Sequence, residues 1–325
     1  MSAPEAFRKL IGQSVAMQQV RDHIQRIARS PVPVLIVGET GTGKELCAEA
    51  ISLLSRRAPF IAVNCAALPE SLVESELFGH ERGAFTGAVQ ARAGMIAAAD
   101  GGTLFLDELA EVPSTVQAKL LRTLESGEYR PLGSTKTLRS RFRILAATSG
   151  DLERIISEGH LRADLFHRLG AVRVRLPPLR ERIEDVPLLA EEFLRRYLER
   201  SDCGPSCLSP EASTVLMQHD WPGNIRQLRN VVEAAAAVAG LEPVVGMLHV
   251  VEVLASSTPD GSRVDILPSL AEARRRAEGR AILDALRRTE GNRERAARLL
   301  RISEATLYRK LGKRSPSQSI LTRAS

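Results

Sequence analysis

The chain lacks the features that mark membrane, secreted and disulfide-bonded proteins. No run of apolar residues approaches the ~18 that a membrane-spanning helix needs. The amino-terminal segment contains no apolar core of a secretory signal. Only four cysteines occur in 325 residues, too few for a disulfide scaffold of this size. A hydrophobic content of 44% and a charged content of 26% exclude wholesale disorder. We therefore expect a globular protein in the reducing cytoplasm.

The net charge is small, but it is unevenly distributed. The whole chain carries +6, from 45 Lys and Arg against 39 Asp and Glu. Residues 271–314 contain 14 of the basic and 6 of the acidic side chains, so this segment carries +8 and the rest carries −2. A basic segment at one end of a near-neutral chain favours nucleic-acid binding, although a solvated arginine-rich helix has the same composition.

The order of apolar runs along the chain predicts an α/β fold. Short apolar runs alternate with helical patterns such as residues 45–54 and 113–124. This alternation predicts a mostly parallel sheet flanked by helices. The runs expected to form its strands are residues 34–37, 60–63, 103–106, 143–148 and 172–176.

After Pro177 and Pro178, helical patterns follow one another without strands. Residues 184–200, 210–218 and 225–239 are expected to be helices, and Ser209 is expected to cap the second of them. We therefore expect an α/β subdomain (residues 1–176), a helical lid subdomain (177–254), a linker (255–268), a further helical module (269–313) and a disordered tail (314–325).

A glycine-rich segment, GETGTGK, follows the first strand and leads into a helix. Its glycines would let backbone N–H groups point at a phosphate, and Lys44 would reach the β- and γ-phosphates. The usual P-loop has Ser or Thr after the lysine to hold Mg²⁺, whereas this chain has Glu45. An incidental glycine-rich turn is the alternative. The predicted phosphate-binding residues are Gly38, Glu39, Thr40, Gly41, Thr42, Gly43, Lys44 and Glu45.

A second motif, GTLFLDE, is an apolar strand that ends in Asp107 and Glu108. Asp107 would hold Mg²⁺, and Glu108 would position or polarise the attacking water. Such an acidic pair also occurs as a helix cap. Together with the P-loop, it predicts ATP hydrolysis, with ATP and Mg²⁺ as the cofactors.

Between these motifs lies the segment ELFGHERGAFTGA, residues 76–88. Its last six residues resemble the signature loop of bacterial enhancer-binding proteins, the AAA+ activators of sigma-54 RNA polymerase. The resemblance extends from residue 10 to residue 311. In isolation the segment would be an ordinary surface loop. The resemblance implies a AAA+ P-loop ATPase fold, and it implies that sigma-54 contacts Gly83, Ala84, Phe85, Thr86, Gly87 and Ala88.

Two strand ends are similar to nucleotide-sensing positions of the family. Asn64 resembles the residue that gates Glu108 according to the nucleotide state, although it also suits a strand-end turn. Thr148 lies where the first sensor of the family begins. Ser149 follows it, where the family usually has Asn, and a shorter Ser would weaken sensing of the γ-phosphate.

The segment WPGNIR, residues 221–226, resembles the second sensor of the family. The resemblance implies that Arg226 faces the nucleotide. Asn224 could instead cap the helix that begins here, and Trp221 is expected to pack in the core under either interpretation.

The stretch from Arg162 to Arg168 resembles the arginine-finger region of the family. Both guanidinium groups would reach the nucleotide of a neighbouring subunit and neutralise charge in the transition state. Surface arginines in salt bridges are the alternative. Fingers that act in trans require a head-to-tail ring. The resemblance implies a hexamer of this chain, or of this chain with a related subunit.

The carboxyl-terminal segment is predicted to bind DNA. Two amphipathic helices separated by a turn at Ser303 predict a helix–turn–helix, and it resembles the Fis-type module of these activators. A basic helical hairpin that packs on the ATPase is the alternative. The second helix would enter the major groove of double-stranded enhancer DNA. The expected base-reading residues are Glu304, Thr306 and Arg309, and the expected phosphate-binding residues are Arg293, Arg295, Lys310 and Lys313.

These motifs leave three hypotheses. The first is a sigma-54-dependent activator whose hexamer hydrolyses ATP and remodels the closed complex of the sigma-54 RNA polymerase holoenzyme. The second is a DNA-binding repressor or assembly factor with a weakened ATPase, which Glu45 and Ser149 favour. The third is a AAA+ chaperone that ignores DNA, and the helix–turn–helix disfavours it.

Control of the activity is expected to come from outside this chain. The ATPase region begins near residue 1, which leaves no room for a receiver or ligand-sensing domain. In this respect the chain resembles the phage-shock and type III secretion activators. We expect control by a negative regulatory protein, by expression level or by a related subunit, unless the sequence is part of a longer chain.

Overall fold

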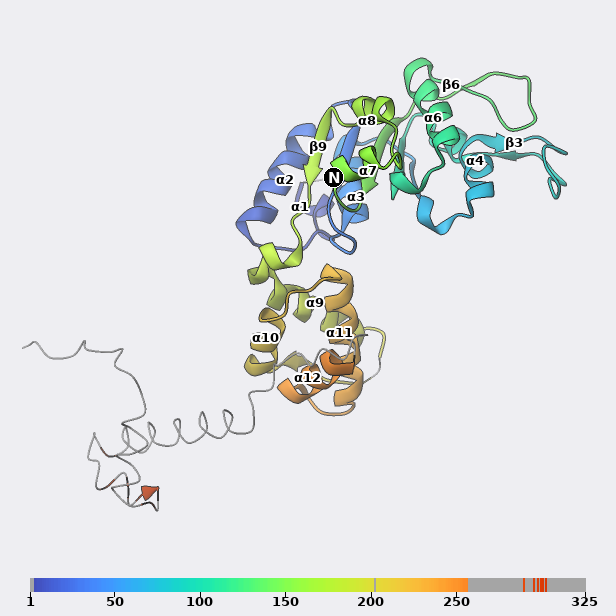
Figure 1. Ribbon diagram of the computed structural model, residues 1–325. Coiled ribbons are helices and arrows are strands. Elements are labelled where there is room, and N and C mark those ends of the chain that lie inside the picture. The colour runs from blue at the N-terminus through green and yellow to red at the C-terminus, as the bar shows by residue number, and fades with distance from the viewer. Residues whose placement is uncertain are drawn as a thin grey trace, which may run out of the picture. The chain divides into compact units, whose positions relative to one another are not determined.

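The computed structural model describes residues 3–201 and 203–256 and, nearer the carboxyl end, Thr289, Arg295, Ala297, Leu299, Leu300 and Ile302. The chain divides into two units, Met1–Leu254 and Ala255–Ser325. The first unit contains the sheet and the helices that Figure 1 labels. The expected tail, and most of the expected linker and helix–turn–helix, lie outside the described residues. Among the described residues, no helix combines the length and apolarity needed to cross a bilayer.

Five parallel strands form one sheet in the order β2-β5-β8-β1-β9. Their bounds are β1 Val34–Val37, β2 Phe60–Asn64, β5 Thr103–Asp107, β8 Arg143–Thr148 and β9 Val172–Arg175. The predicted parallel α/β sheet is therefore confirmed. Because the strands are parallel, their carboxyl ends meet at one edge, where Asn64 is paired with Asp107 and Val37 with Thr148.

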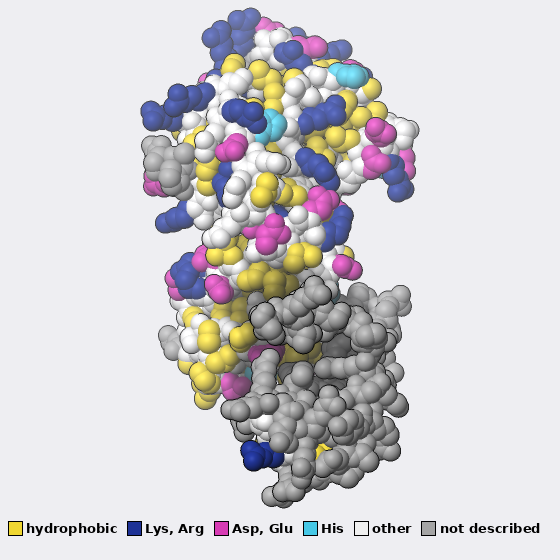
Figure 2. Space-filling view, turned by 90° about the vertical axis from the view of Figure 1, so that its left-hand side faces the viewer, with side chains coloured by type: hydrophobic (Ala, Val, Ile, Leu, Met, Phe, Trp, Pro, Cys, Tyr) yellow, Lys and Arg dark blue, Asp and Glu magenta, His cyan; other side chains and the backbone are white. Residues whose placement is uncertain are grey.

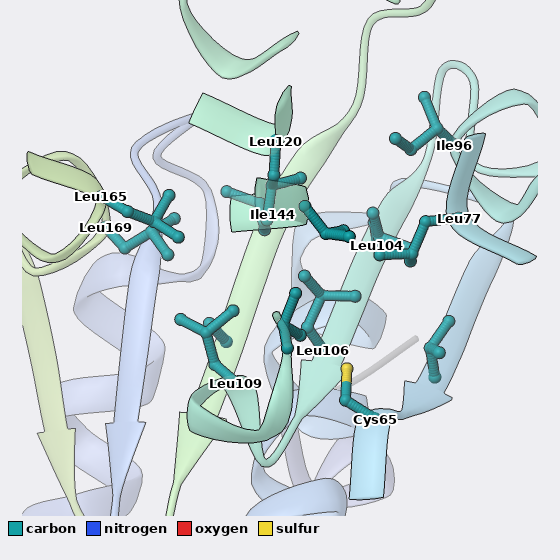
Figure 3. Packing of buried hydrophobic residues seen from close by; sticks show 14 of the residues in the cluster. Cys65, Leu77, Ile96, Leu104, Leu106, Leu109, Leu120, Ile144, Leu165 and Leu169 are labelled. Atoms are coloured by element: carbon teal, nitrogen blue, oxygen red, sulfur yellow. The ribbon is translucent and has the colours of Figure 1, made fainter. Parts of the chain in front are cut away.

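Helices cover both faces of the sheet, and alternate side chains of each strand enter one of two apolar cores. Helices α2 and α3 pack against Phe105 and Leu145 on one face. On the other face, helices α4, α6 and α8 contribute to the apolar core that contains Leu104 and Leu106 (Figure 3). The helices of this part are α1 Ala3–Ala6, α2 Val15–Ala28, α3 Lys44–Ser55, α4 Glu70–Phe78, α5 Met95–Ala98, α6 Ser114–Ser126, α7 Leu152–Ser157 and α8 Ala163–Leu169.

The helical part that follows the sheet has the bounds α9 Val186–Leu198, α10 Pro210–Met217, α11 Asn224–Ala239 and α12 Met247–Ser256, with short strands β10 Cys207–Leu208 and β11 Val244–Val245. Ser209 caps α10 as predicted, since its side chain accepts a hydrogen bond from the amide of Ala212. Helix α9 begins later than predicted because Ile183–Asp185 forms a 3₁₀ turn. Trp221 is fully buried, and its indole N–H donates to the carbonyl of Leu216.

Two hairpins extend from the same side of the α/β part (Figure 1). One joins β3 Gly79–His80 to β4 Arg92–Ala93, and the other joins β6 Glu128–Tyr129 to β7 Leu138–Arg139. The two hairpins touch, because the amide of Glu81 donates to the carbonyl of Leu132 at 2.9 Å and the amide of Leu132 donates to Gly79 at 2.8 Å. The first hairpin carries residues 83–88.

The surface of the first unit does not present a single sign of charge. On the face drawn in Figure 2, acidic side chains lie between basic ones over the described residues. This agrees with the near-neutral composition of the chain outside residues 271–314.

Candidate functional site

The predicted P-loop connects β1 to α3, as its sequence pattern required. Gly43 is the residue before α3 and adopts a left-handed backbone conformation. Lys44 begins the helix and is only 6% exposed. Its ammonium group donates to the carbonyl of Gly38 at 3.1 Å and contacts the Glu108 carboxylate at 3.2 Å. The buried cation therefore lies at the carboxyl edge of the sheet.

A cleft of about 630 Å³ opens around Lys44. Its walls come from the P-loop, from the ends of β2, β5 and β8, and from helices α9 and α11. Predicted site residues that line it are Thr40, Gly41, Gly43, Lys44, Glu45, Asn64, Asp107, Glu108 and Arg226, and Ser149 lines it as well. Four predicted cofactor-binding residues do not line the cleft, namely Gly38, Glu39, Thr42 and Thr148.

The Glu108 carboxylate is held by neighbours on both sides. One oxygen meets Lys44, and the other accepts hydrogen bonds from the Ser149 amide at 3.0 Å and from the Ser149 hydroxyl at 2.8 Å. Glu108 also has a φ of +53°, a conformation that costs energy for a residue with a side chain. Within residues 3–201, Glu108 makes its side-chain hydrogen bonds with Lys44 and Ser149 and not with Asn64, which was expected to gate it. The gating role of Asn64 stays a prediction.

Thr148 and Ser149, at the predicted first sensor, have different surroundings. Thr148 is fully buried in β8, and its hydroxyl has no hydrogen-bond partner among the described residues. Ser149, the next residue, reaches the cleft and bonds Glu108 directly. In the sequence, Ser149 stands out only as a departure from the family pattern. The signal that could have identified its role is its position directly after β8, which neighbours β5, the strand that ends at Asp107.

Burial shapes the electrostatics of Asp107. Its pKa is raised, chiefly because burial disfavours the charged form, while Lys44 acts in the opposite direction. The amide of Glu108 donates to its carboxylate at 3.1 Å. A cation beside Asp107 would offset the cost of burying its charge. The carboxylate therefore fits the donor set of a Mg²⁺ site.

Glu39 turns away from the cleft and binds the helical part. Its carboxylate accepts two hydrogen bonds from Arg180, at 2.5 and 2.8 Å, and one from Asn224 at 3.1 Å. These bonds, with Arg180 first, lower the pKa of Glu39 to about 2. The Glu39 side chain therefore joins the P-loop to the lid, and the predicted place of Glu39 beside the nucleotide stays a prediction.

Asn224 does not cap helix α11, contrary to one interpretation of the sequence. The residue before the helix is Gly223, and Asn224 itself has a φ of +52°. Its amide group donates to Glu39 and to the carbonyl of Thr40, and its oxygen accepts from the amide of Leu179 at 2.8 Å. Asn224 therefore bridges the P-loop and the segment that leads into the lid.

Neither arginine of the predicted finger region lines the cleft of its own chain. Arg162 pairs with Asp164 through two hydrogen bonds, and Arg168 donates to the carbonyl of Leu124 at 3.1 Å. The amide of Arg162 is fixed by buried Gln117, whose side-chain oxygen accepts it at 2.9 Å. Their action in trans stays a prediction.

Residues 83–88 form a turn at the end of the first hairpin, in which Ala88 is buried, Ala84 is half-buried and the other four residues are exposed. Gly83 and Gly87 have φ values of +82° and +104°, which residues with a side chain rarely adopt. The amide of Gly83 donates to the carbonyl of Ala88 at 2.9 Å, which closes the turn. Phe85 is 37% exposed, and Thr86 is exposed as well.

The predicted DNA-binding residues lie almost entirely outside the described part of the chain. Arg295 is described and is exposed on a helix, while Ala297 beside it is buried. Predicted readers and phosphate contacts that fall outside the described residues are Arg293, Glu304, Thr306, Arg309, Lys310 and Lys313.

Family comparisons match all three parts of the chain. A model described as the sigma-54 interaction domain matches residues 10–175. A AAA+ ATPase lid domain model matches residues 180–265, and a model described as bacterial regulatory protein, Fis family, matches residues 273–313. The chain belongs to the sigma-54-dependent transcriptional activators. This activator is a AAA+ ATPase that binds nucleotide, and its partners are sigma-54 RNA polymerase and DNA.

Similar curated proteins and solved structures agree with this assignment. The activator is 44% identical to regulatory protein AtoC of Escherichia coli (strain K12) over 308 residues, 93% of this chain and 67% of that protein. It is 44% identical to the DNA-binding transcriptional regulator NtrC of Salmonella typhimurium, over 93% of this chain and 69% of that one.

The structure is similar to that of NtrX from Brucella abortus in complex with ATP, with a TM-score of 0.70, 37% identity and coverage of 93% of this chain and 68% of that one. A mutant of Thermotoga maritima RuvB, at 14% identity and a TM-score of 0.53 over 94% of this chain and 87% of that one, supports the fold alone.

Proposed function

We propose that the activator hydrolyses ATP with Mg²⁺ in the cleft around Lys44, as a ring of six copies, and that hydrolysis moves the residue 83–88 loop against sigma-54. The observation that carries this proposal is the pairing of Lys44 with Glu108 in a cleft at the carboxyl edge of a parallel sheet. Ligands of open α/β sheets bind at that edge. Work on DNA-bound RNA polymerase would take place in the cytoplasm.

In this proposal, Lys44 and Asp107 together compensate the negative charge of the ATP phosphates, Lys44 directly and Asp107 through Mg²⁺. Lys44 binds the β- and γ-phosphates, and the amino end of α3 adds its favourable field. Asp107 holds Mg²⁺, which neutralises charge on the phosphates. Glu45 lines the cleft where other P-loops have a hydroxyl, so it would reach the ion through water. Arg226 approaches the same cleft from α11.

Glu108 orients the attacking water. In the structure its carboxylate is shared between Lys44 and Ser149. The γ-phosphate competes for the Lys44 ammonium because a phosphate carries more negative charge than a carboxylate. Glu108 then keeps its two hydrogen bonds from Ser149, and its other oxygen is free to accept a water proton.

In the proposed ring, a neighbouring subunit supplies the arginines that complete each cleft. Arg162 and Arg168 lie outside their own cleft, and the buried side chain of Gln117 fixes the base of Arg162. We expect Arg162 to leave Asp164 and enter the cleft of the next subunit, where it stabilises the transition state. A head-to-tail interface of this kind closes into a ring.

The carboxyl-terminal module brings this ring to enhancer DNA. Glu304, Thr306 and Arg309 are proposed to read base edges in the major groove, and Arg293, Arg295, Lys310 and Lys313 to bind phosphates. The Fis-family match over residues 273–313 supports this proposal.

Replacing Thr86 tests whether ATP hydrolysis can be separated from open-complex formation. Thr86→Ala should leave the ATPase rate within about twofold, because Thr86 is exposed and is not among the residues that line the cleft, and it should abolish open-complex formation. Steady-state ATPase assays and in vitro transcription from a sigma-54 promoter measure the two effects. Thr115→Ala, at an exposed threonine of α6, is the matched control. Normal open-complex formation by Thr86→Ala would sink the proposed role of the loop.

A further inference from the structure

The imidazole of His80 contacts both a fixed helix and the tip of the residue 83–88 loop. The hydroxyl of Ser75, in α4, lies 2.8 Å from His80 Nδ1. The same ring lies edge-on to Phe85, with 5.0 Å between the ring centroids and 64° between the planes. A single side chain therefore connects α4 to the most exposed large apolar side chain of the turn.

The helix side of this connection is firmly held. Ser75 is buried, and its neighbours Val73 and Leu77 belong to the core that packs on the sheet. The backbone of His80 is paired with Arg92 in β4 and bridges to Leu132 in the second hairpin. His80 therefore has little freedom to follow the loop if the loop moves.

The loop side is held by few contacts. Among the described residues, no atom lies within 4 Å of a Cβ added at Gly83 or Gly87, so the space where their side chains would stand is open. Ala84 is close to Gly133 of the second hairpin, where an added Cβ would come within 2.9 Å of the Ala84 Cβ. Phe85 rests on the His80 ring. These two contacts and the burial of Ala88, which is 7% exposed, hold the turn.

We propose that His80 is a positioning residue that, with Ser75, holds Phe85 against the base of the loop while the activator is at rest. The inference rests on the proposed function of the loop. Helix α4 is the first α-helix after Asn64, which lines the cleft, and only the short turn Cys65–Ala67 intervenes. A displacement of α4 that follows nucleotide hydrolysis would move Ser75, weaken its hydrogen bond to His80 and release Phe85 for sigma-54.

Three variants separate the two contacts of His80. Ser75→Ala removes the hydrogen bond, His80→Asn removes the ring, and Ser75→Thr keeps a hydroxyl and should behave as the unaltered chain. A neutral hydrogen bond or a ring contact shifts such an equilibrium by about fivefold. In the full-length chain we expect Ser75→Ala and His80→Asn each to bind labelled sigma-54 about fivefold more tightly without nucleotide. Binding with ADP and aluminium fluoride, and the ATPase kcat and KM, should stay unchanged.

A second measurement does not depend on sigma-54. Amide hydrogen exchange of residues 83–89 should be about fivefold faster in Ser75→Ala than in Ser71→Ala, a control at an exposed serine of the same helix. Unchanged exchange and unchanged sigma-54 affinity in both variants would overturn the role of His80. An unaltered chain that fails to bind sigma-54 with any nucleotide would instead overturn the proposed function of the loop. In that case, faster amide hydrogen exchange in Ser75→Ala would still support the contact between His80 and Phe85.

Discussion

Lys44 in the cleft is 6% exposed and bonds to Gly38 and Glu108, whereas Phe85 in the loop is 37% exposed and rests on the ring of His80. The cleft side chains come from strand ends whose positions the parallel register sets. The loop closes on itself through hydrogen bonds within a six-residue turn. The cleft is therefore pre-organised by the sheet, while the loop can move at low cost.

This difference assigns chemistry and movement to different parts of the molecule. Catalytic groups need fixed geometry, and elements that move in a working cycle come from regions with few buried contacts. Substitutions of the cleft residues, and of the arginines expected to complete the cleft, should therefore change ATP hydrolysis.

The largest effect would show that the cleft is incomplete within one chain. Arg162→Ala should lower the ATPase rate by about 10³-fold, because the proposed finger no longer reaches the next subunit. Lys44→Ala should abolish nucleotide binding. Mixing the two inactive variants should restore activity, since one supplies an intact cleft and the other an intact finger. Steady-state hydrolysis across mixing ratios is the measurement.

The matched control for Arg162 is Arg154→Ala, which removes another exposed arginine with a carboxylate neighbour, Glu158. This control should hydrolyse ATP normally. A mixture of Arg162→Ala and Lys44→Ala that stays inactive would contradict action in trans, and the cleft would then be complete in itself.

Glu108→Gln should separate binding from hydrolysis within the cleft. The amide cannot take a proton from water, so kcat should fall by about 10²–10⁴-fold. ATP affinity should stay equal or rise, because Lys44 loses a competing carboxylate. Single-turnover hydrolysis and equilibrium binding of a fluorescent nucleotide give the two values. A variant that retains at least a third of the parent rate would show that Glu108 is not the base.

Ser149→Ala tests whether the residue that sequence analysis treated as a weakness is a functional partner of Glu108. It removes one hydrogen bond to a carboxylate, so kcat should fall about tenfold with little change in ATP affinity. Ser149→Asn, which introduces the residue usual in the family, should retain activity because it also offers a donor. An unchanged kcat in the alanine variant would leave the backbone amide as the only necessary donor.

Features with a local pattern were predictable from the sequence. The strands are short apolar runs, and the glycine-rich turn and the acidic pair each follow a strand, so their places at one sheet edge follow from the parallel topology. Local patterns also located Ser209 as a cap, because a cap and its partner lie within three residues.

Contacts between distant segments could not be predicted in this way. Glu39 meets Arg180, 141 residues away, and Asn224, 185 residues away. Within its own segment Glu39 is simply one residue of a phosphate-binding loop, and Asn224 has the composition of a helix cap. The bond between Ser149 and Glu108 is likewise formed across two neighbouring strands. Only the folded chain brings these partners together.

The smallest expected effect concerns the pair that joins the P-loop to the lid. Glu39 has a pKa of about 2 in the folded chain against an ordinary value of 4.5, so the ionised form is stabilised by folding. This contribution is present above about pH 4.5 and is lost as the pH falls towards 2. Both partners are substantially exposed, so solvent screens the pair. Glu39→Gln should lower the melting temperature by about 1–2 °C at pH 7. By pH 3 the difference in melting temperature between Glu39→Gln and the unaltered chain should be smaller, as scanning calorimetry would show.

Glu158→Gln, which removes an exposed pair within α7 and its following turn, is the control and should shift the melting temperature less. An equal shift in the two variants would mean that the Glu39–Arg180 pair does not stabilise the contact between the lid and the P-loop, which would then depend on Asn224, on the bond from Arg182 to the carbonyl of Thr42 and on the backbone.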